Sequence, residues 1–182
     1  MQDTTVQYQQ ATTRAKDIFL KKTKDYGTSW RVLRPISIVD QIMIKALRIR
    51  NIQAKTQLVT DSIESEFIGI VNYGLIGLIQ LAKGAAAIEE LPYDEASLLY
   101  THALAQAEQT MRLKNHDYGE AWRDMSQESF ADLILVKLLR VKQILANDGK
   151  TLISEGIDAN YIDIVNYAAF ALILIAEGKH KA

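Results

Sequence analysis

Hydrophobic positions along the chain recur at the three- and four-residue spacing of amphipathic helices. One face of the first such segment carries Ala11, Ala15, Ile18, Phe19 and Lys22. One face of the second carries Val39, Ile42, Met43, Ala46 and Leu47. Residues 67–82 are apolar nearly all round, which is typical of a helix in the middle of a bundle. No stretch sustains a two-residue alternation, so the pattern predicts an all-α protein without a sheet.

Capping and turn residues set the expected helix boundaries. Gly27 is expected to end the first helix as a left-handed C-cap. Asp61-Ser-Ile-Glu64 has the arrangement of a capping box and is expected to open the third helix. The second half is expected to begin its helices near Pro92, Phe130 and Asp158. The chain's prolines, at 35 and 92, both fall between expected helices.

The chain contains an internal duplication. Residues 24–31 (KDYGTSWR) recur as residues 116–123 (HDYGEAWR), an offset of 92. Residues 15–50 share 13 identities in 36 with residues 107–142, where chance predicts about two. Residues 67–84 share 9 identities in 18 with residues 161–178, at an offset of 94. The change of offset indicates a two-residue insertion in a loop, where insertions cost little.

These features predict one domain over residues 1–182, with repeat one at 5–84, repeat two at 93–178 and a seam near 84–93. Each repeat is expected to hold three helices. A single repeat would leave the flanks of its apolar third helix exposed to water. Packing the two third helices together about a pseudo-two-fold axis would bury these flanks, with Gly69, Gly74 and Gly77 facing Asp163, Ala168 and Ala171.

Composition and charge narrow the function classes. The formal net charge is −1, so no long-range positive field favours a nucleic-acid partner. Cysteine is absent, which excludes disulfides and thiolate sites. Residues 1–10 are polar, unlike a signal peptide, and the apolar run 162–176 is shorter than the roughly 20 residues of a membrane span. We therefore expect a cytoplasmic protein without a membrane partner; the sequence allows a homodimer.

Two familiar site signatures fail. Residues 148–151 (DGKT) resemble the end of a phosphate-binding P-loop, but Ile144 stands where that motif needs glycine, and no strand precedes it. The three histidines are scattered without the spacing of zinc ligands.

Matched positions in the two repeats provide the candidate site residues. The first motif comprises Asp25, Tyr26, Gly27 and Trp30, repeated as Asp117, Tyr118, Gly119 and Trp122. Turn formation and core packing would explain these residues, and so would a site. The second motif is Asn72-Tyr73, repeated as Asn166-Tyr167; an asparagine in an apolar helix needs a hydrogen-bond partner, from the protein or from a substrate.

The matched basic pairs are Lys45 with Arg48, and Lys137 with Arg140. Residues three apart share one face of a helix. Such a face is often solvated and paired with carboxylates, but the same pairs would also hold a phosphate. We predict that these four residues bind phosphate.

Acidic residues on the third helices differ between the repeats. Repeat one has Glu66 and Gly69 where repeat two has Asn160 and Asp163. Two acids three apart would offer oxygen ligands to a divalent cation, and each repeat holds one of the two. Just upstream, Asp61-x-x-Glu64 and Glu155-x-x-Asp158 are acid pairs that helix capping would also explain.

Taken together, Asp-Tyr-Gly-x-x-Trp, Lys-x-x-Arg and Asn-Tyr resemble the nucleotide modification associated domain family, once in each repeat. The resemblance implies a role in nucleotide or modified-base metabolism. It places the family's acids on Glu155 and Asp163 in repeat two, and on Asp61 and Gly69 in repeat one, where the carboxylate is lost. The helical plan is also similar to the all-α nucleoside triphosphate pyrophosphohydrolases, although no Glu-x-x-Glu stands on the second helices.

These resemblances predict a nucleotide-handling protein, with magnesium-dependent hydrolysis of nucleoside triphosphates as the candidate reaction. In that case Asp132, Glu155, Asp163 and Glu66 would hold the metal. The lost carboxylate at Gly69 implies a single competent site, which would depend on repeat two, or one composite site. The alternative is a non-catalytic helical binding or assembly module that kept the fold and lost the chemistry.

Overall fold

The computed structural model describes residues 3–56, 58–84, 86–152 and 154–182. The described ranges contain α-helices and short 3-10 helices and no strand, which confirms the all-α prediction. In chain order the elements are α1 (Thr4–Tyr26), η1 (Ser29–Val32), α2 (Pro35–Gln53), α3 (Ile63–Lys83), α4 (Tyr93–Tyr118), η2 (Ala121–Asp124), α5 (Gln127–Ala146) and α6 (Ile157–Ala176).

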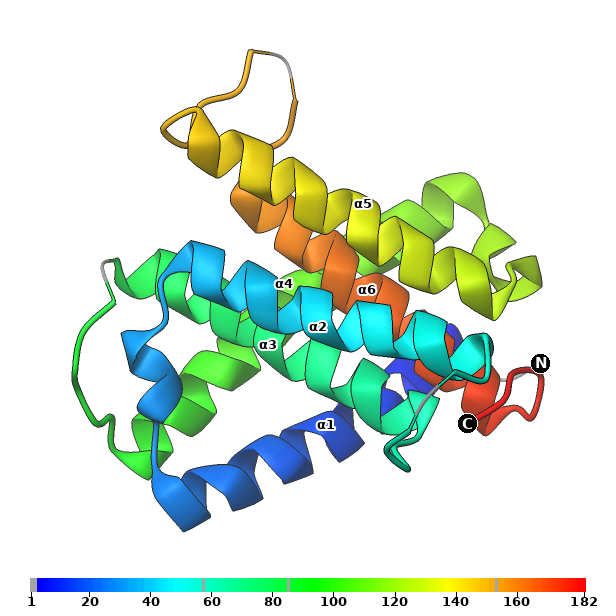
Figure 1. Ribbon diagram of the computed structural model, residues 1–182, viewed down its shortest axis with the longest axis horizontal. Coiled ribbons are helices and arrows are strands. Elements are labelled where there is room, and N and C mark those ends of the chain that lie inside the picture. The colour runs from blue at the N-terminus through cyan, green and yellow to red at the C-terminus, as the bar shows by residue number, and fades with distance from the viewer. Residues whose placement is uncertain (1–2, 57, 85, 153) are drawn as a thin grey trace.

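The helices pack as two related halves (Figure 1). At the centre, α3 packs against α6 in the most extensive helix–helix contact of the molecule. The pairs α2–α3 and α5–α6 are equivalent, and α2 packs against α5 across the axis that relates the halves. Helix α1 contacts α3 and α6 equally, as α4 contacts α6 and α3. This pairing is what a pseudo-two-fold arrangement of tandem repeats requires.

The α3–α6 contact is close because two of the three expected glycines face α6, whereas Gly69 faces Lys45 of α2. A Cβ atom on Gly74 would lie 2.6 Å from Cγ2 of Val165, and one on Gly77 would lie 2.9 Å from the Tyr161 ring. Both α3 and α6 are long and apolar enough to cross a membrane by length and composition alone. In each, 72% of the most apolar window is buried inside the bundle, as in the central helix of a globular core.

Crossed hydrogen bonds join the two repeats. Asn72 on α3 donates to the carbonyl of Ala15 (3.0 Å) and accepts from the Tyr100 hydroxyl of α4 (2.7 Å). In the equivalent arrangement of the other repeat, Asn166 on α6 donates to the carbonyl of Ala107 (3.1 Å) and accepts from the Tyr8 hydroxyl of α1 (2.7 Å). Each asparagine amide thus bonds both repeats inside the core, which gives these residues a packing role.

The structure corrects several local expectations. Gly27 has φ 73° and ψ −147°, which lies outside the left-handed helical region and in one that essentially only glycine adopts. The N-cap of α3 is Ser62, whose hydroxyl accepts from the Ser65 amide, so Asp61 is not the cap. Leu47, expected in the core, is 45% exposed, and Ile49 lies in the core instead.

Candidate functional site

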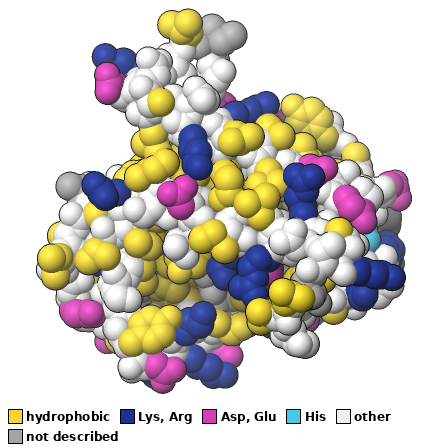
Figure 2. Space-filling model, in the orientation of Figure 1, with side chains coloured by type: hydrophobic (Ala, Val, Ile, Leu, Met, Phe, Trp, Pro, Cys, Tyr) yellow, Lys and Arg dark blue, Asp and Glu magenta, His cyan; other side chains and the backbone are white. Residues whose placement is uncertain are grey.

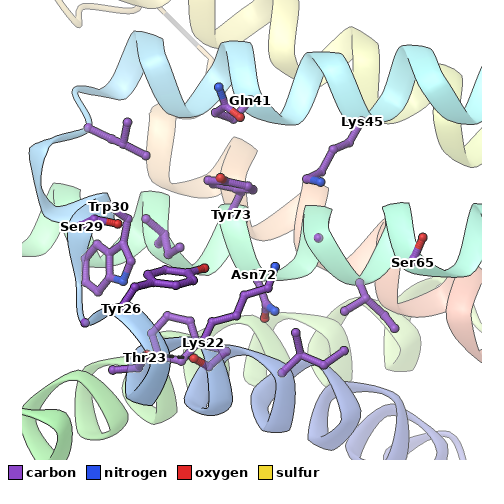
Figure 3. A pocket seen from close by; sticks show the side chains of 17 residues that line it. Lys22, Thr23, Tyr26, Ser29, Trp30, Gln41, Lys45, Ser65, Asn72 and Tyr73 are labelled. Carbon is purple, nitrogen blue, oxygen red and sulfur yellow. Dashed lines mark hydrogen bonds between the residues drawn. The ribbon is translucent and has the colours of Figure 1, made fainter. Parts of the chain in front are cut away.

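A cavity of about 610 Å³ opens in repeat one between α1, η1, α2 and α3. This volume falls within the roughly 300–1,000 Å³ of small-molecule sites. Figure 2 shows the surface hollowed here, with hydrophobic side chains in the hollow and basic side chains beside it. The polar and aromatic side chains around the cavity come from all four elements (Figure 3).

Four aromatic side chains line the cavity: Phe19, Tyr26, Trp30 and Tyr73. Trp30 is 8% exposed and packs against Phe19, with 6.2 Å between ring centroids. Its indole N–H finds no hydrogen-bond acceptor in the part of the chain that the structure describes. Burial raises the pKa of Tyr26, and the neighbouring Tyr73 and Asp25 raise it further. The Tyr26 phenol therefore stays protonated at neutral pH and can donate a hydrogen bond.

Two lysines reach into the cavity from opposite walls. Lys22 extends from α1 and Lys45 from α2, and both point toward the middle of the cavity (Figure 3). Within the described residues, Lys22 has no carboxylate partner. None of the described lining residues is Asp or Glu, so the lining carries positive charge only.

Lys45 is shared between the cavity and an ion-pair cluster on α2 and α3. The buried Glu66 carboxylate lies 3.5 Å from Nζ of Lys45 and 3.3 Å from Nη1 of Arg48. Arg48 also pairs with Asp61. Arg48 is thus engaged by two acids and does not line the cavity, while Lys45 does.

Repeat two arranges the equivalent residues differently. Asp163 stands where repeat one has Gly69, and its two carboxylate oxygens accept from Lys114 (2.7 Å) and Lys137 (2.8 Å). These lysines are the equivalents of Lys22 and Lys45. Burial lowers the pKa of Lys114, but the hydrogen bond and charge of Asp163 outweigh that effect, so the pKa is raised.

The aromatic end of repeat two is also occupied. Trp122, the equivalent of Trp30, stacks on Phe170 with 4.2 Å between ring centroids and 5° between the ring planes. Repeat one has Ile76 at the position of Phe170. The open cavity therefore belongs to repeat one, whereas the sequence suggested repeat two as the competent half.

The structure separates the four predicted metal ligands. Glu66 and Asp163 are each held by two basic side chains, Asp132 lies 3.9 Å from Arg50 on the surface, and Glu155 borders an open groove beside α5. No group of three acidic or histidine side chains suited to a metal ion occurs within the described ranges. The magnesium site stays a prediction.

The other predicted residues divide between structure and surface. Arg140 is exposed and borders the same groove as Glu155. Asp25 and Asp117 are exposed at the ends of α1 and α4, outside the cavity lining. Gly119 repeats the unusual backbone of Gly27, with φ 65° and ψ −154°. Tyr118 is exposed. Tyr167 is half-buried, and its pKa is raised chiefly by burial and further by the charge of Asp163.

Lys22 was missed as a site residue in the sequence. It was assigned to the apolar face of the first helix, yet a lysine on that face, matched by Lys114, was a usable signal. What the sequence could not show is that Gly69 leaves the space and Asp163 fills it.

The fold and cavity define a duplicated all-α protein with an open, lysine-lined cavity in one repeat. The family model for nucleotide modification associated domain 1 matches residues 22–81 and again residues 114–175. The chain belongs to this family, and both matches coincide with the repeats. No curated protein and no solved structure matches the chain. The family's name links the chain to nucleotide modification.

Proposed function

We propose that the chain binds a nucleotide, or a small molecule with the same pairing of aromatic ring and anionic group, in the cavity of repeat one. The observation that carries this proposal is the lining: four aromatic side chains, two lysines and no carboxylate among the described lining residues. The family's link to nucleotide modification supports the same ligand class.

The base and the phosphate of a nucleotide each find a matching group in the cavity. A base can stack on Tyr26, Trp30 or Tyr73, and stacking on an aromatic side chain contributes about 1–3 kcal/mol per base. Lys22 and Lys45 offer charge-assisted hydrogen bonds to phosphate oxygens.

Recognition is the function that this lining favours over metal-dependent hydrolysis. Magnesium prefers carboxylate oxygens. Of the four predicted ligands, Glu66 pairs with the cavity residue Lys45, and the charges of Lys45 and Arg48 already neutralise the Glu66 carboxylate. We therefore propose nucleotide binding and assign no reaction to the cavity; magnesium is included in the test.

The test is thermal unfolding with nucleoside mono-, di- and triphosphates, each with and without magnesium. A ligand present at about 100 times its Kd should stabilise the protein by about 2.7 kcal/mol. Lys22→Ala should abolish the response, because Lys22 is exposed in the cavity and has no structural partner there to lose.

The matched control is Lys21→Ala, which removes the same charge one residue away. Lys21 is 72% exposed, pairs with Asp17 at 2.8 Å and does not line the cavity. Its response to nucleotide should match the wild type. A full panel without any shift, or equal responses in Lys22→Ala and wild type, would refute the proposal.

A further inference from the structure

The two repeats carry their acidic residue at different positions of the third helix, and the nearby lysines are therefore paired differently. Each repeat keeps one acid beside the lysine of its second helix: Glu66 beside Lys45, and Asp163 beside Lys137. The two acids stand at positions one helical turn apart in the repeat, because Glu66 matches Asn160 and Asp163 matches Gly69. This difference decides whether the lysine of the first helix, Lys22 or Lys114, has a carboxylate partner.

In repeat two, Asp163 reaches both lysines. Its oxygens lie 2.7 Å from Lys114 and 2.8 Å from Lys137, so one carboxylate bridges α4 and α5. The Asp163 side chain is 9% exposed, which marks a buried, fully engaged anion. A carboxylate and a phosphate present their oxygens to ammonium groups in similar ways.

In repeat one, the same place lacks an anion. Gly69 has no side chain, and the cavity extends to it. A Cβ atom there would lie 2.7 Å from Cε of Lys45, the far end of a flexible side chain that can move aside. Lys22 has no carboxylate partner among the described residues, and Nζ of Lys45 lies 3.5 Å from the Glu66 carboxylate.

We propose that repeat two is a closed copy of the repeat-one site, in which the Asp163 carboxylate occupies the position that the ligand's anionic group takes between Lys22 and Lys45. This inference rests on the proposed function and extends it. It places the phosphate of the ligand beside Gly69, and it makes repeat two a latent anion site that its own side chain fills.

Inorganic phosphate is the suitable probe, because the Trp122–Phe170 stack fills the aromatic end of repeat two and would exclude a base. Four proteins are compared by isothermal titration and thermal unfolding: wild type, Gly69→Asp, Asp163→Gly and the double variant that exchanges the two residues. Circular dichroism reports whether each is folded.

The wild type should bind one phosphate, and Asp163→Gly should bind two. Gly69→Asp should lose phosphate binding and melt at a higher temperature without phosphate, because the new carboxylate pairs with Lys22 and Lys45. The double variant should again bind one phosphate, and its binding should now be lost on Lys114→Ala and retained on Lys22→Ala.

Gly69→Asn is the matched control for bulk, since it fills the same space without charge. It should block phosphate without raising the melting temperature, whereas Gly69→Asp should do both. This comparison decides the question even when Asp163→Gly does not fold. A folded Gly69→Asp protein that still binds phosphate through Lys22, or that gains no stability over Gly69→Asn, overturns the inference.

The two proposals fail in different ways. A wild type that binds phosphate through Lys22 but no nucleotide, beside a double variant that binds phosphate through Lys114, refutes the proposed function and retains the latent site. A wild type that binds through Lys22, beside a folded double variant that binds nothing, refutes the latent site alone.

Discussion

At the scale of single residues, the matched asparagines hold the two repeats together. Asn72 accepts from Tyr100 and Asn166 from Tyr8, and all four side chains are buried. The sequence left open whether these asparagines serve packing or a substrate. Both ends of each amide are bonded inside the core, which accounts for a packing role, while Asn72 also lines the cavity of repeat one.

Tyr100→Phe should destabilise the fold by about 1–3 kcal/mol, because it leaves the Asn72 oxygen buried without its donor. Tyr8→Phe is the matched variant in the other repeat and should cost about the same. Chemical denaturation with an unchanged m-value provides the measurement. A loss below about 0.5 kcal/mol in both variants would show that the crossed bonds do not contribute.

Residue roles were only partly readable in the sequence. Trp30 and Trp122 are buried, as their core interpretation predicted. Lys45 was identified as a phosphate-binding candidate and does line the cavity. The pairing of Asp163 with Lys114 joins residues 49 positions apart on different helices, and helical spacing within one segment carries no information on such a contact.

At the scale of elements, the central helices differ where they meet. Repeat one has Gly74 and Gly77 on α3, and repeat two has alanine at the matching positions on α6. The close approach is therefore asymmetric: Val165 and Tyr161 of α6 occupy the space over the two glycines. The branched Val165 side chain lies in the core and has little room to move.

Gly74→Ala should accordingly destabilise the protein by about 1–3 kcal/mol through overpacking, despite the better helix propensity of alanine. Ala168→Gly, at the matching position of α6, tests the opposite change and should cost about 1 kcal/mol or more from propensity and lost packing. Thermal unfolding of both variants provides the comparison. A stabilised Gly74→Ala protein would contradict the close contact.

Helix type and approximate extent were accessible from periodicity, and boundaries less so. The predicted starts near Pro92 and Asp158 agree with α4 and α6 within a residue. Helix α5 begins at Gln127, three residues before the predicted Phe130, because Ser126 supplies the N-cap. At α3, the capping-box pattern predicts Asp61 as the N-cap, but the adjacent Ser62 has that role and Asp61 pairs with Arg48.

At the scale of the whole molecule, the duplication was the most informative feature of the sequence. The tandem repeats and the pairing of the two central helices followed from it, since two copies of an apolar third helix can bury each other. The location of the cavity did not follow. It depends on which repeat has a small residue beside its lysines, and conserved motifs shared by both repeats cannot distinguish them.

The core contains tyrosines that should make the protein sensitive to alkali. Burial raises the pKa of Tyr8, Tyr100 and Tyr161 in the fold, above the value near 10 of an unfolded chain. Their contribution to stability is present below about pH 10 and is lost as the pH rises above it, because the unfolded state releases these protons first.

Above about pH 10 the free energy of unfolding should therefore decline, and part of the tyrosine ionisation should coincide with loss of helical circular dichroism. Phenolate absorbance recorded alongside circular dichroism measures both. Complete ionisation of all eight tyrosines while the helices persist would contradict the burial of these three.

The central claim is that the cavity of repeat one binds a nucleotide through Lys22 and Lys45, and a crystal structure grown with the nucleotide that gives the largest thermal shift tests it most directly. The account predicts one bound nucleotide, with its phosphate between these two lysines beside Gly69 and its base against Tyr26, Trp30 or Tyr73. Asp163 should remain between Lys114 and Lys137. A nucleotide bound elsewhere, or a phosphate remote from Lys22, would contradict it.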